Sequence, residues 1–321
     1  MKNKIIKLLK IILPLFLGVF LIWYSLESAS PQEREELWQN ILNANPWFLL
    51  LSILFGTLSH LSRAYRWKFL LEPMGYNPKL PNSFMAVMAG YLANFGIPRS
   101  GEVLRAASLS SYEKIPFEKA FGTIISERIA DVVVMLSITA FTFFLQTEHL
   151  LAYFEANDIN PVVSIGILFG LILIGILILQ IIKRSKLPFL IRIKKTAKGL
   201  LEGMRSILRM RQKWAFIFHT LFIWLMYILM FYVVVFSIPG LERIEFSVIM
   251  AAFVVGSFAI SATNGGIGVY PVAIGAILVL FGISKQNGEA FGWITWGTQT
   301  LLVLILGGLS FLLLPIFNRR K

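Results

Sequence analysis

The sequence predicts an all-α polytopic membrane protein with about six full spans and two re-entrant or broken helical hairpins. Three observations predict this fold class. Of the 321 residues, 57% are hydrophobic and 15% are charged, and the mean hydropathy of +0.73 lies far above that of a soluble domain. Uncharged runs recur with lengths near the roughly 20 residues that a span needs. Lys and Arg gather in alternate connections, which sets the orientation of the spans. The uncharged runs are 11–26, 46–61, 80–98, 132–147, 159–182, 214–241, 246–284 and 290–318.

The N-terminal region predicts two spans joined by an acidic outer loop. Four lysines precede the first apolar run, so the N-terminus is expected in the cytoplasm. We interpret 8–26 as a retained helix rather than a cleaved signal peptide, because no clear small-residue cleavage site follows. The outer loop is rich in Glu and is expected to carry a short interfacial helix up to Asn45. A second helix begins near Pro46 and returns inward to Arg63, Arg66 and Lys68.

Residues 80–112 are predicted to enter from the cytoplasm and return to it. If 80–98 crossed alone, the segment 183–213, with eleven Lys or Arg and one acid, would lie outside. The positive-inside rule rejects that topology. The tip of the hairpin is expected at 94–101, where Gly96 and Pro98 interrupt the helix.

The rest of the chain follows from the same rule. We expect a third helix at 116–146, a fourth at 160–182, a basic amphipathic linker at 183–213 and a fifth helix at 214–238. The run 246–284 carries no charge and is broken by Gly and Pro near its middle, which predicts a second hairpin dipping from outside or two thin spans. A sixth helix at 290–315 leads to a cytoplasmic C-terminus. All but four of the 30 Lys and Arg residues then fall on the cytoplasmic side.

The order of elements predicts an inverted repeat within one transmembrane domain, 1–321. Residues 1–150 and 159–321 each read as helix, helix, hairpin and helix, with opposite orientations. Inverted repeats with broken helices that meet near the midplane are typical of secondary transporters. Both hairpin tips are therefore candidate parts of a substrate site.

The first tip combines cations, an acid and helix-breaking residues. Arginine binds phosphate or carboxylate through a planar fork, and helix ends at a tip add backbone N–H donors. Arg99 could instead mark the cytoplasmic interface. The candidate substrate-binding residues here are Asn94, Pro98, Arg99, Gly101, Glu102 and Arg105.

The third helix carries Glu127, Arg128 and Asp131 about 16 Å from its start, near the middle of a bilayer core about 30 Å thick. Charges at that depth cost about 2.5–3.5 kcal/mol each on insertion scales. Glu127 and Asp131 share one helix face. Two interpretations stay open: an ion-pair cluster that locks this helix to the first hairpin, and a substrate or proton site.

The second tip offers polar and small residues at the centre of an uncharged run. Its glycines allow a close backbone approach, either for a substrate or for tight helix packing. The candidate residues are Thr263, Asn264, Gly265, Gly266, Gly268 and Tyr270.

Other features carry structural interpretations. His60, Arg63 and Arg66 recur every three residues, and we interpret them as snorkelling anchors, with head-group capture as the alternative. Tyr65 and Trp67 are expected at the interface. The chain has no Cys and only three scattered His residues, so we expect no metal and no cofactor. The net charge of +13 is attributed to contact with anionic lipid, not to nucleic acid.

These motifs resemble the lysylphosphatidylglycerol synthase transmembrane-region family, also called flippase-like proteins. The resemblance covers nearly the whole chain and rests on three groups: Asn94 with 98–102 and Arg105, then Glu127 to Asp131, then 265–268. Many members have a proline before the glycine pair and an acid after it. This chain has Asn264 and the Tyr270–Pro271 region at those places. Fused relatives carry an aminoacyltransferase domain, and we expect this chain to be the stand-alone form that makes no aminoacyl lipid.

The resemblance implies movement of lipids with charged or glycosylated heads between leaflets. The leading hypothesis is therefore a flippase in a prokaryotic cytoplasmic membrane, with anionic or polyprenyl-phosphate-linked lipids as its partners. A non-transporting scaffold or regulator of a glycosyltransferase is the alternative, and a homo-oligomer is compatible with either. An intramembrane enzyme acting on lipid phosphates is a third hypothesis, although no nucleophile–base pair stands out.

Overall fold

The computed structural model describes residues 16, 18–97, 99–148, 210–263 and 265–319, and every element in these ranges is helical. A helix at Gly18–Glu27 is followed by α2 (Pro31–Leu42) and α3 (Pro46–Leu71). The predicted fourth helix and nearly all of the linker 183–213 lie outside the described residues. The remaining helices are α4 (Leu80–Gly96), α5 (Ser100–Glu113), α6 (Phe117–Leu145), α10 (Lys213–Val233), α11 (Phe246–Ala262), α12 (Val269–Val279) and α13 (Lys285–Phe317), with short 3-10 turns at Glu72–Met74 and Val234–Ser237.

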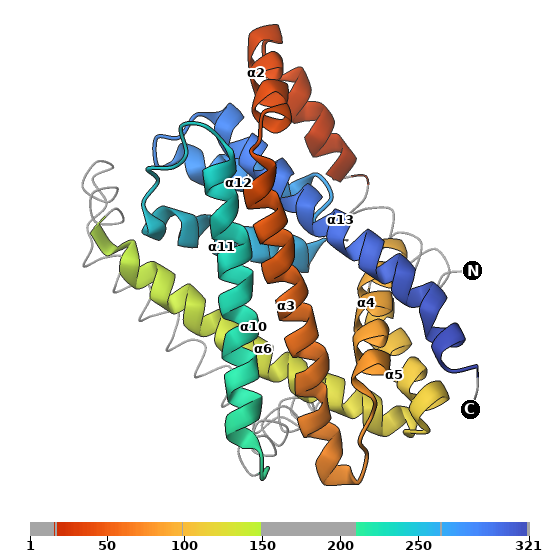
Figure 1. Cartoon of the computed structure of the whole chain (residues 1–321). Coiled ribbons are helices and arrows are strands. Elements are labelled where there is room, and N and C mark those ends of the chain that lie inside the picture. The colour runs from red at the N-terminus through yellow and green to blue at the C-terminus, as the bar shows by residue number, and fades with distance from the viewer. Residues whose placement is uncertain (1–15, 17, 98, 149–209, 264, 320–321) are drawn as a thin grey trace, which may run out of the picture.

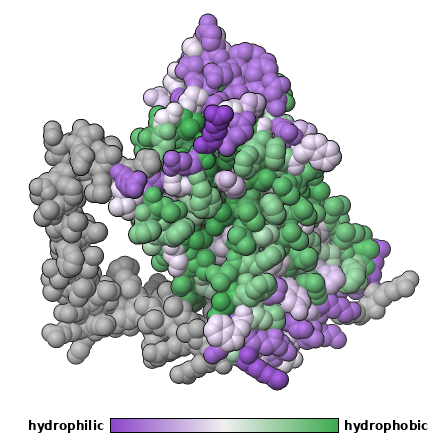
Figure 2. Space-filling view, turned by 60° about the vertical axis from the view of Figure 1, so that its left-hand side comes forward, coloured by the Kyte–Doolittle hydropathy of each residue, from purple (hydrophilic) through white to green (hydrophobic). Residues whose placement is uncertain are grey.

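Four described helical segments are long and apolar enough to cross a membrane. They are Pro46–Met74, Phe117–Leu145, Lys213–Ser237 and Lys285–Phe317, and they coincide with the predicted second, third, fifth and sixth helices. Figure 2 shows hydrophobic surface across the middle of one face and hydrophilic surface gathered at the two ends. This distribution fits a polytopic membrane protein.

At the centre of the molecule α3 and α10 pack side by side and run in opposite directions (Figure 1). The sequence sets the start of α3 at Pro46, because the side chain of Asn45 accepts a hydrogen bond from the Trp47 backbone N–H. The interfacial helix expected before Asn45 is α2, which lies at one end of the molecule and packs on the start of α13.

The first predicted hairpin is present as α4 and α5, with Ile97 as the C-cap of α4 and Arg99 as the N-cap of α5. A helix cannot continue through these caps, since Ile97 is extended and Arg99 has a φ of +62°. The two arms approach closely at Gly101: a Cβ there would collide with the carbonyl oxygen of Gly90. The Gly101 backbone N–H donates to Asn94 Oδ1 at 2.7 Å, so Asn94 holds the turn together.

The second predicted hairpin is present as α11 and α12, joined by residues 263–268. Its tip meets the first tip, because a Cβ on Gly265 would lie 2.8 Å from Cε1 of Phe95 in α4. The helix Gly18–Glu27 also packs against this tip, with Gly18 in backbone contact with Ile267 and Gly268. The two breaks in the helical pattern are therefore neighbours in space, although they are far apart in the sequence.

One boundary differs from the sequence prediction. The sixth helix was expected to begin near 290, but α13 begins at Lys285. The Ser284 hydroxyl accepts from the Asn287 backbone N–H and caps the extra turn. Charged Lys285 and Glu289 therefore belong to the helix rather than to a preceding loop.

Candidate functional site

A cluster of buried charges joins α3, α5 and α6. Arg63 Nη1 lies 2.7 Å from both Glu127 Oε1 and Asp131 Oδ2. Arg66 lies 3.0 Å from the same two carboxylates, and Arg105 Nη2 lies 3.0 Å from Glu127 Oε2. Each of the five residues is at most 6% exposed. Charges so deeply buried persist only when opposite charges compensate them, so the three helices hold one another through this cluster.

Spacing explains how single helices supply these groups. Glu127 and Asp131 are four residues apart on α6, and Arg63 and Arg66 are three apart on α3, so each pair projects from one face. The two acids on one helix therefore meet the two arginines on the other. Arg105 reaches Glu127 from the returning arm of the first hairpin.

Aromatic and hydroxyl groups line the cluster. The Arg105 guanidinium lies 4.4 Å from the ring centroid of Trp67, whose indole N–H donates to Thr123 Oγ1 at 2.8 Å. Arg66 donates to Thr220 Oγ1 of α10 at 2.8 Å and lies over the ring of Phe216. Cation–π contacts stabilise a guanidinium while leaving some of its donors without an acceptor.

A second, more exposed pair lies at the edge of the cluster. Arg128 Nη2 donates to Glu102 Oε1 at 3.0 Å and lies 3.9 Å from Asp131. The Arg128 side chain is 40% exposed and that of Glu102 is 23% exposed. This pair forms a partly accessible border between α5 and α6.

The cluster has more positive than negative charge. The four arginines Arg63, Arg66, Arg105 and Arg128 face three acids, Glu102, Glu127 and Asp131. Donors also remain: Nε and Nη1 of Arg105 and Nε of Arg63 and Arg66 are buried without a hydrogen-bond partner among the described residues. The contacts of Arg66 with the acids are ion pairs in distance but lack hydrogen-bond geometry. Among the described residues, one positive charge of the cluster therefore has no counter-charge.

The structure separates the predicted residues of the first tip into two groups. Glu102 and Arg105 belong to the cluster, whereas Arg99 is exposed at the tip and has no ion-pair partner within the described ranges. Asn94 and Gly101 shape the turn. Pro98 lies outside the described residues.

The second tip is held by its own hydrogen bonds. Thr263 Oγ1 donates to Ala259 O and accepts from the Gly266 N–H, and the Gly265 carbonyl accepts from the indole of Trp296 at 2.7 Å. Tyr270 is buried in the apolar core. Asn264 is not among the described residues. Within the described part of the chain, no hydrogen bond or ion pair links this tip to the charged cluster.

Arg63 and Arg66 correct the sequence interpretation. They were interpreted as snorkelling anchors, but both are buried and pair with Glu127 and Asp131. Trp67 was placed at the interface and is fully buried instead. The physical reason is that acids inside α6 require buried counter-charges. The three-residue spacing of the arginines, matched to the two acids, was the available signal.

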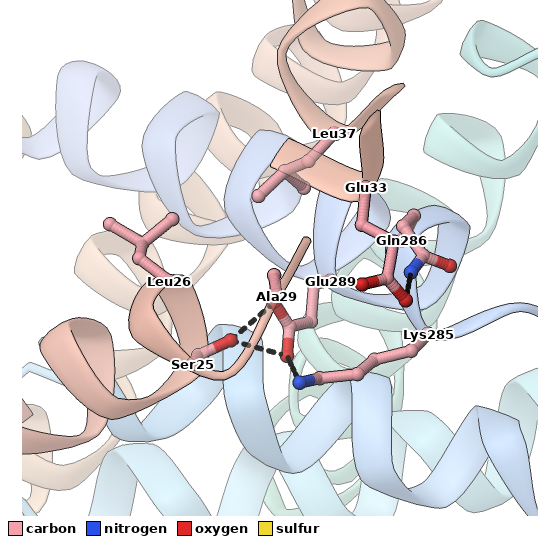
Figure 3. Close-up of a pocket in the computed structure, with 8 residues that line it drawn as sticks. All are labelled: Ser25, Leu26, Ala29, Glu33, Leu37, Lys285, Gln286 and Glu289. Carbon is pink, nitrogen blue, oxygen red and sulfur yellow. Dashed lines mark hydrogen bonds and ion pairs between the residues drawn. The ribbon is translucent and has the colours of Figure 1, made fainter. Parts of the chain in front are cut away.

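A smaller buried carboxylate lies near the start of α13 (Figure 3). Ser25 Oγ lies 2.7 Å from each oxygen of Glu289, and Lys285 Nζ lies 3.8 Å from Oε1. On the other side, Gln286 donates to Glu33 of α2 at 2.7 Å. These contacts fasten the helix Gly18–Glu27 and α2 to α13. They line a cavity of only about 10 Å³, the size of about one water molecule.

Among the described residues, no three His, Cys, Asp or Glu side chains gather in a way that could hold a metal ion.

Comparison with known proteins places the chain in a family. Residues 11–307 match the family described as "Lysylphosphatidylglycerol synthase TM region". The chain belongs to this family. The match confirms the resemblance carried by the two tips and the α6 acids. It makes the protein a multi-pass membrane protein of a lipid-related family.

A UPF0104 membrane protein of Methanocaldococcus jannaschii is 34% identical to this family member over 104 residues. The matched segment covers 32% of this chain and 31% of that relative, so the chain spans about a third of the relative's length. No solved structure matches this lysylphosphatidylglycerol synthase transmembrane-region protein.

Proposed function

We propose that this protein is a lipid flippase. Its substrate is a lipid whose head group bears a phosphate and is aminoacylated or glycosylated, and it moves that head between the leaflets of a prokaryotic cytoplasmic membrane. The observation that carries the proposal is the excess positive charge of the cluster around Glu127 and Asp131, buried within a membrane protein. Such a charge is costly in an apolar medium unless an anion can approach it.

The two hairpins supply a polar route in this proposal. Their tips meet at Phe95 and Gly265, and irregular backbone is tolerated at membrane depth only where protein or water surrounds it. The head group passes between the tips while its apolar tail stays in the bilayer. Arg99 at the first tip makes the first contact with the phosphate, and the free donors of Arg105 receive it.

The proposed topology is an inverted repeat with six spans and both termini in the cytoplasm. The order α3, hairpin, α6 matches the order α10, hairpin, α13, and α3 runs antiparallel to α10 (Figure 1). This arrangement supports hairpins that enter from opposite sides. It allows alternating access around one fixed site. No chemical step on the lipid is needed.

Arg99 provides the test, because its role can be separated from folding. Its φ of +62° suits glycine, so Arg99→Gly removes the guanidinium without straining the backbone. We expect Arg99→Gly and Arg99→Ala to lose at least about 90% of the translocation of a head-labelled anionic lipid in vesicles, the size expected when one charge-assisted contact is lost. Lys114→Gly is the matched control, since Lys114 has a φ of +55° and lies at the far end of α5.

Translocation that is unchanged in both Arg99 variants would overturn the assignment. A protein that moves no lipid but purifies with a stoichiometric glycosyltransferase would support the scaffold hypothesis instead.

A further inference from the structure

A cavity of about 120 Å³ lies where the end of α3 meets the start of α4. This volume is roughly ten times the space of about 10–15 Å³ that one water molecule needs. Its polar lining consists of Tyr65, Lys68, Asn77 and Ser83, and its apolar lining includes Ala64 and Leu80. The cavity is separate from the charged cluster, and none of these residues is part of the flippase site proposed above.

The polar groups of this cavity match an anion. Lys68 supplies an ammonium group and has no carboxylate within ion-pair distance in the described ranges, and no acid belongs to the lining. Ser83 is 2% exposed and lines the cavity, so its hydroxyl can donate a hydrogen bond to a ligand there.

The start of α4 adds a further favourable field. This 17-residue helix begins at Leu80 beside the cavity, and no side chain caps its first turn. Pro81 has no N–H and the Ser83 N–H bonds to Lys79 O, so the helix dipole and the N–H groups of Leu80 and Asn82 are what favour a negative group at this end. The nearest acid at this end, Glu113, is engaged by the Lys79 N–H and the Asn82 side chain.

The cavity lies on the same helix seam that leads to the buried arginines. One face of α3 carries three residues spaced four apart, His60, Ala64 and Lys68. They lie against Tyr91, Val87 and Ser83 of antiparallel α4, respectively. The rings of His60 and Tyr91 contact each other at 5.0 Å, while Ala64 and Val87 are buried between the two ends. The cavity is thus at one end of the contact between α3 and α4. The cluster residue Arg63 lies near the other end of this contact.

The surface at the mouth of the cavity suits an acyl chain. Of the lining residues, Tyr65 is 39% exposed and Leu80 is 37% exposed. An apolar flank next to an ammonium and a hydroxyl matches a lipid, whose phosphate and tail are covalently joined. A soluble phosphate would gain nothing from the flank.

We propose that this cavity binds the phosphate of an anionic lipid, with Lys68 as its counter-ion and Ser83 as a hydrogen-bond donor. Binding itself does not depend on the proposed translocation. Only its role, as the position where a lipid docks before it reaches the charged cluster, rests on the proposed function.

The test is a titration of purified full-length protein with a fluorescent short-chain phosphatidylglycerol, with a zwitterionic lipid and glycerol phosphate as separate arms. We expect Lys68→Gln and Ser83→Ala each to weaken binding of the anionic lipid about tenfold. Lys79→Gln is the matched control, because it removes the same charge at the same end but does not line the cavity. It should bind as the unaltered protein does.

Equal weakening by Lys68→Gln and Lys79→Gln, with no effect of Ser83→Ala, would overturn the site in favour of general surface attraction. Binding of glycerol phosphate without binding of the lipid would also overturn it. Arg99→Gly separates the two proposals, since it should abolish translocation and leave this binding unchanged. Melting temperatures of all variants check that the fold is intact.

Discussion

Gly265 at the second hairpin tip lies against the ring of Phe95 at the end of α4, so that a Cβ on Gly265 would come 2.8 Å from Cε1. This contact brings together two helix breaks that are 170 residues apart in sequence. In the proposed function, this contact is where an opening between the hairpins would begin.

Gly265→Ala is expected to reduce translocation strongly. The new methyl group would press on Phe95, and the φ of +69° would strain an alanine by about 1–2 kcal/mol. Gly282→Ala is the matched control, because Gly282 has a φ of +78° but open space around it. If Phe95→Ala restores translocation to the Gly265→Ala protein in a double-mutant cycle, the contact itself is responsible. Equal loss in the Gly282→Ala protein would contradict this explanation.

Glu127 is buried and Glu102 is partly exposed, so their replacement should lower the free energy of unfolding by different amounts. Glu127→Gln leaves three buried arginines short of a counter-charge and should lower the free energy of unfolding by about 3–5 kcal/mol. Glu102→Gln removes a partly exposed pair and should cost less than about 1 kcal/mol. Unfolding in denaturant measures both. Similar losses in the two variants would show that the cluster is not what holds α6 to its neighbours.

Ser25 should matter for the attachment of the N-terminal helix. Its hydroxyl donates to the carboxylate of Glu289, so Ser25→Ala leaves a buried carboxylate, 5% exposed, without that donor. We expect a loss of about 1.5–3 kcal/mol in the free energy of unfolding. Ser137→Ala, which removes only a bond to the backbone of its own helix, is the control and should have little effect. A thermal shift no larger than the control's would argue against this anchor.

The docking of α2 should weaken in acid. The Ser30 backbone N–H and then the Ser30 hydroxyl hold the pKa of Glu33 below its ordinary value, and Gln286 contributes as well. Because the pKa of Glu33 is lowered in the folded protein, the ionised carboxylate stabilises α2 fully at pH values above the ordinary pKa. This contribution is lost as the pH falls through the folded pKa. Fluorescence of Trp38 on α2, followed from about pH 6 to about pH 3, should report the change. In Glu33→Gln the titration should disappear, and its persistence would assign the change to another group.

Much of the fold could be predicted from the sequence because the membrane imposes strong rules. The lengths of the uncharged runs predicted the spans at Phe117–Leu145 and near Pro46. The distribution of Lys and Arg predicted that 80–112 forms a hairpin rather than a span. The break at 97–99 followed from Gly and Pro in an apolar run. The start of α13 was wrong by five residues, since a cap formed by one serine does not show in hydropathy.

The site was less accessible to prediction. Glu102, Arg105, Glu127, Arg128 and Asp131 were identified, because a charge in an apolar helix stands out. Arg63 and Arg66 were missed as partners of the α6 acids, since arginines at the end of an apolar run also suit an interface. The pairing depends on which face of α3 turns toward α6, and only helix packing decides that.

The sequence by itself determined that this chain is helical, that it spans a membrane, and where its helices break, because lipid penalises unpaired charge and unpaired backbone wherever they occur. Tertiary structure alone decided which charges neutralise one another and that, among the described residues, one positive charge of the cluster is left over. It also decided that Phe95 meets Gly265, since contacts between distant segments depend on helix rotation and crossing, which local patterns of residues do not encode.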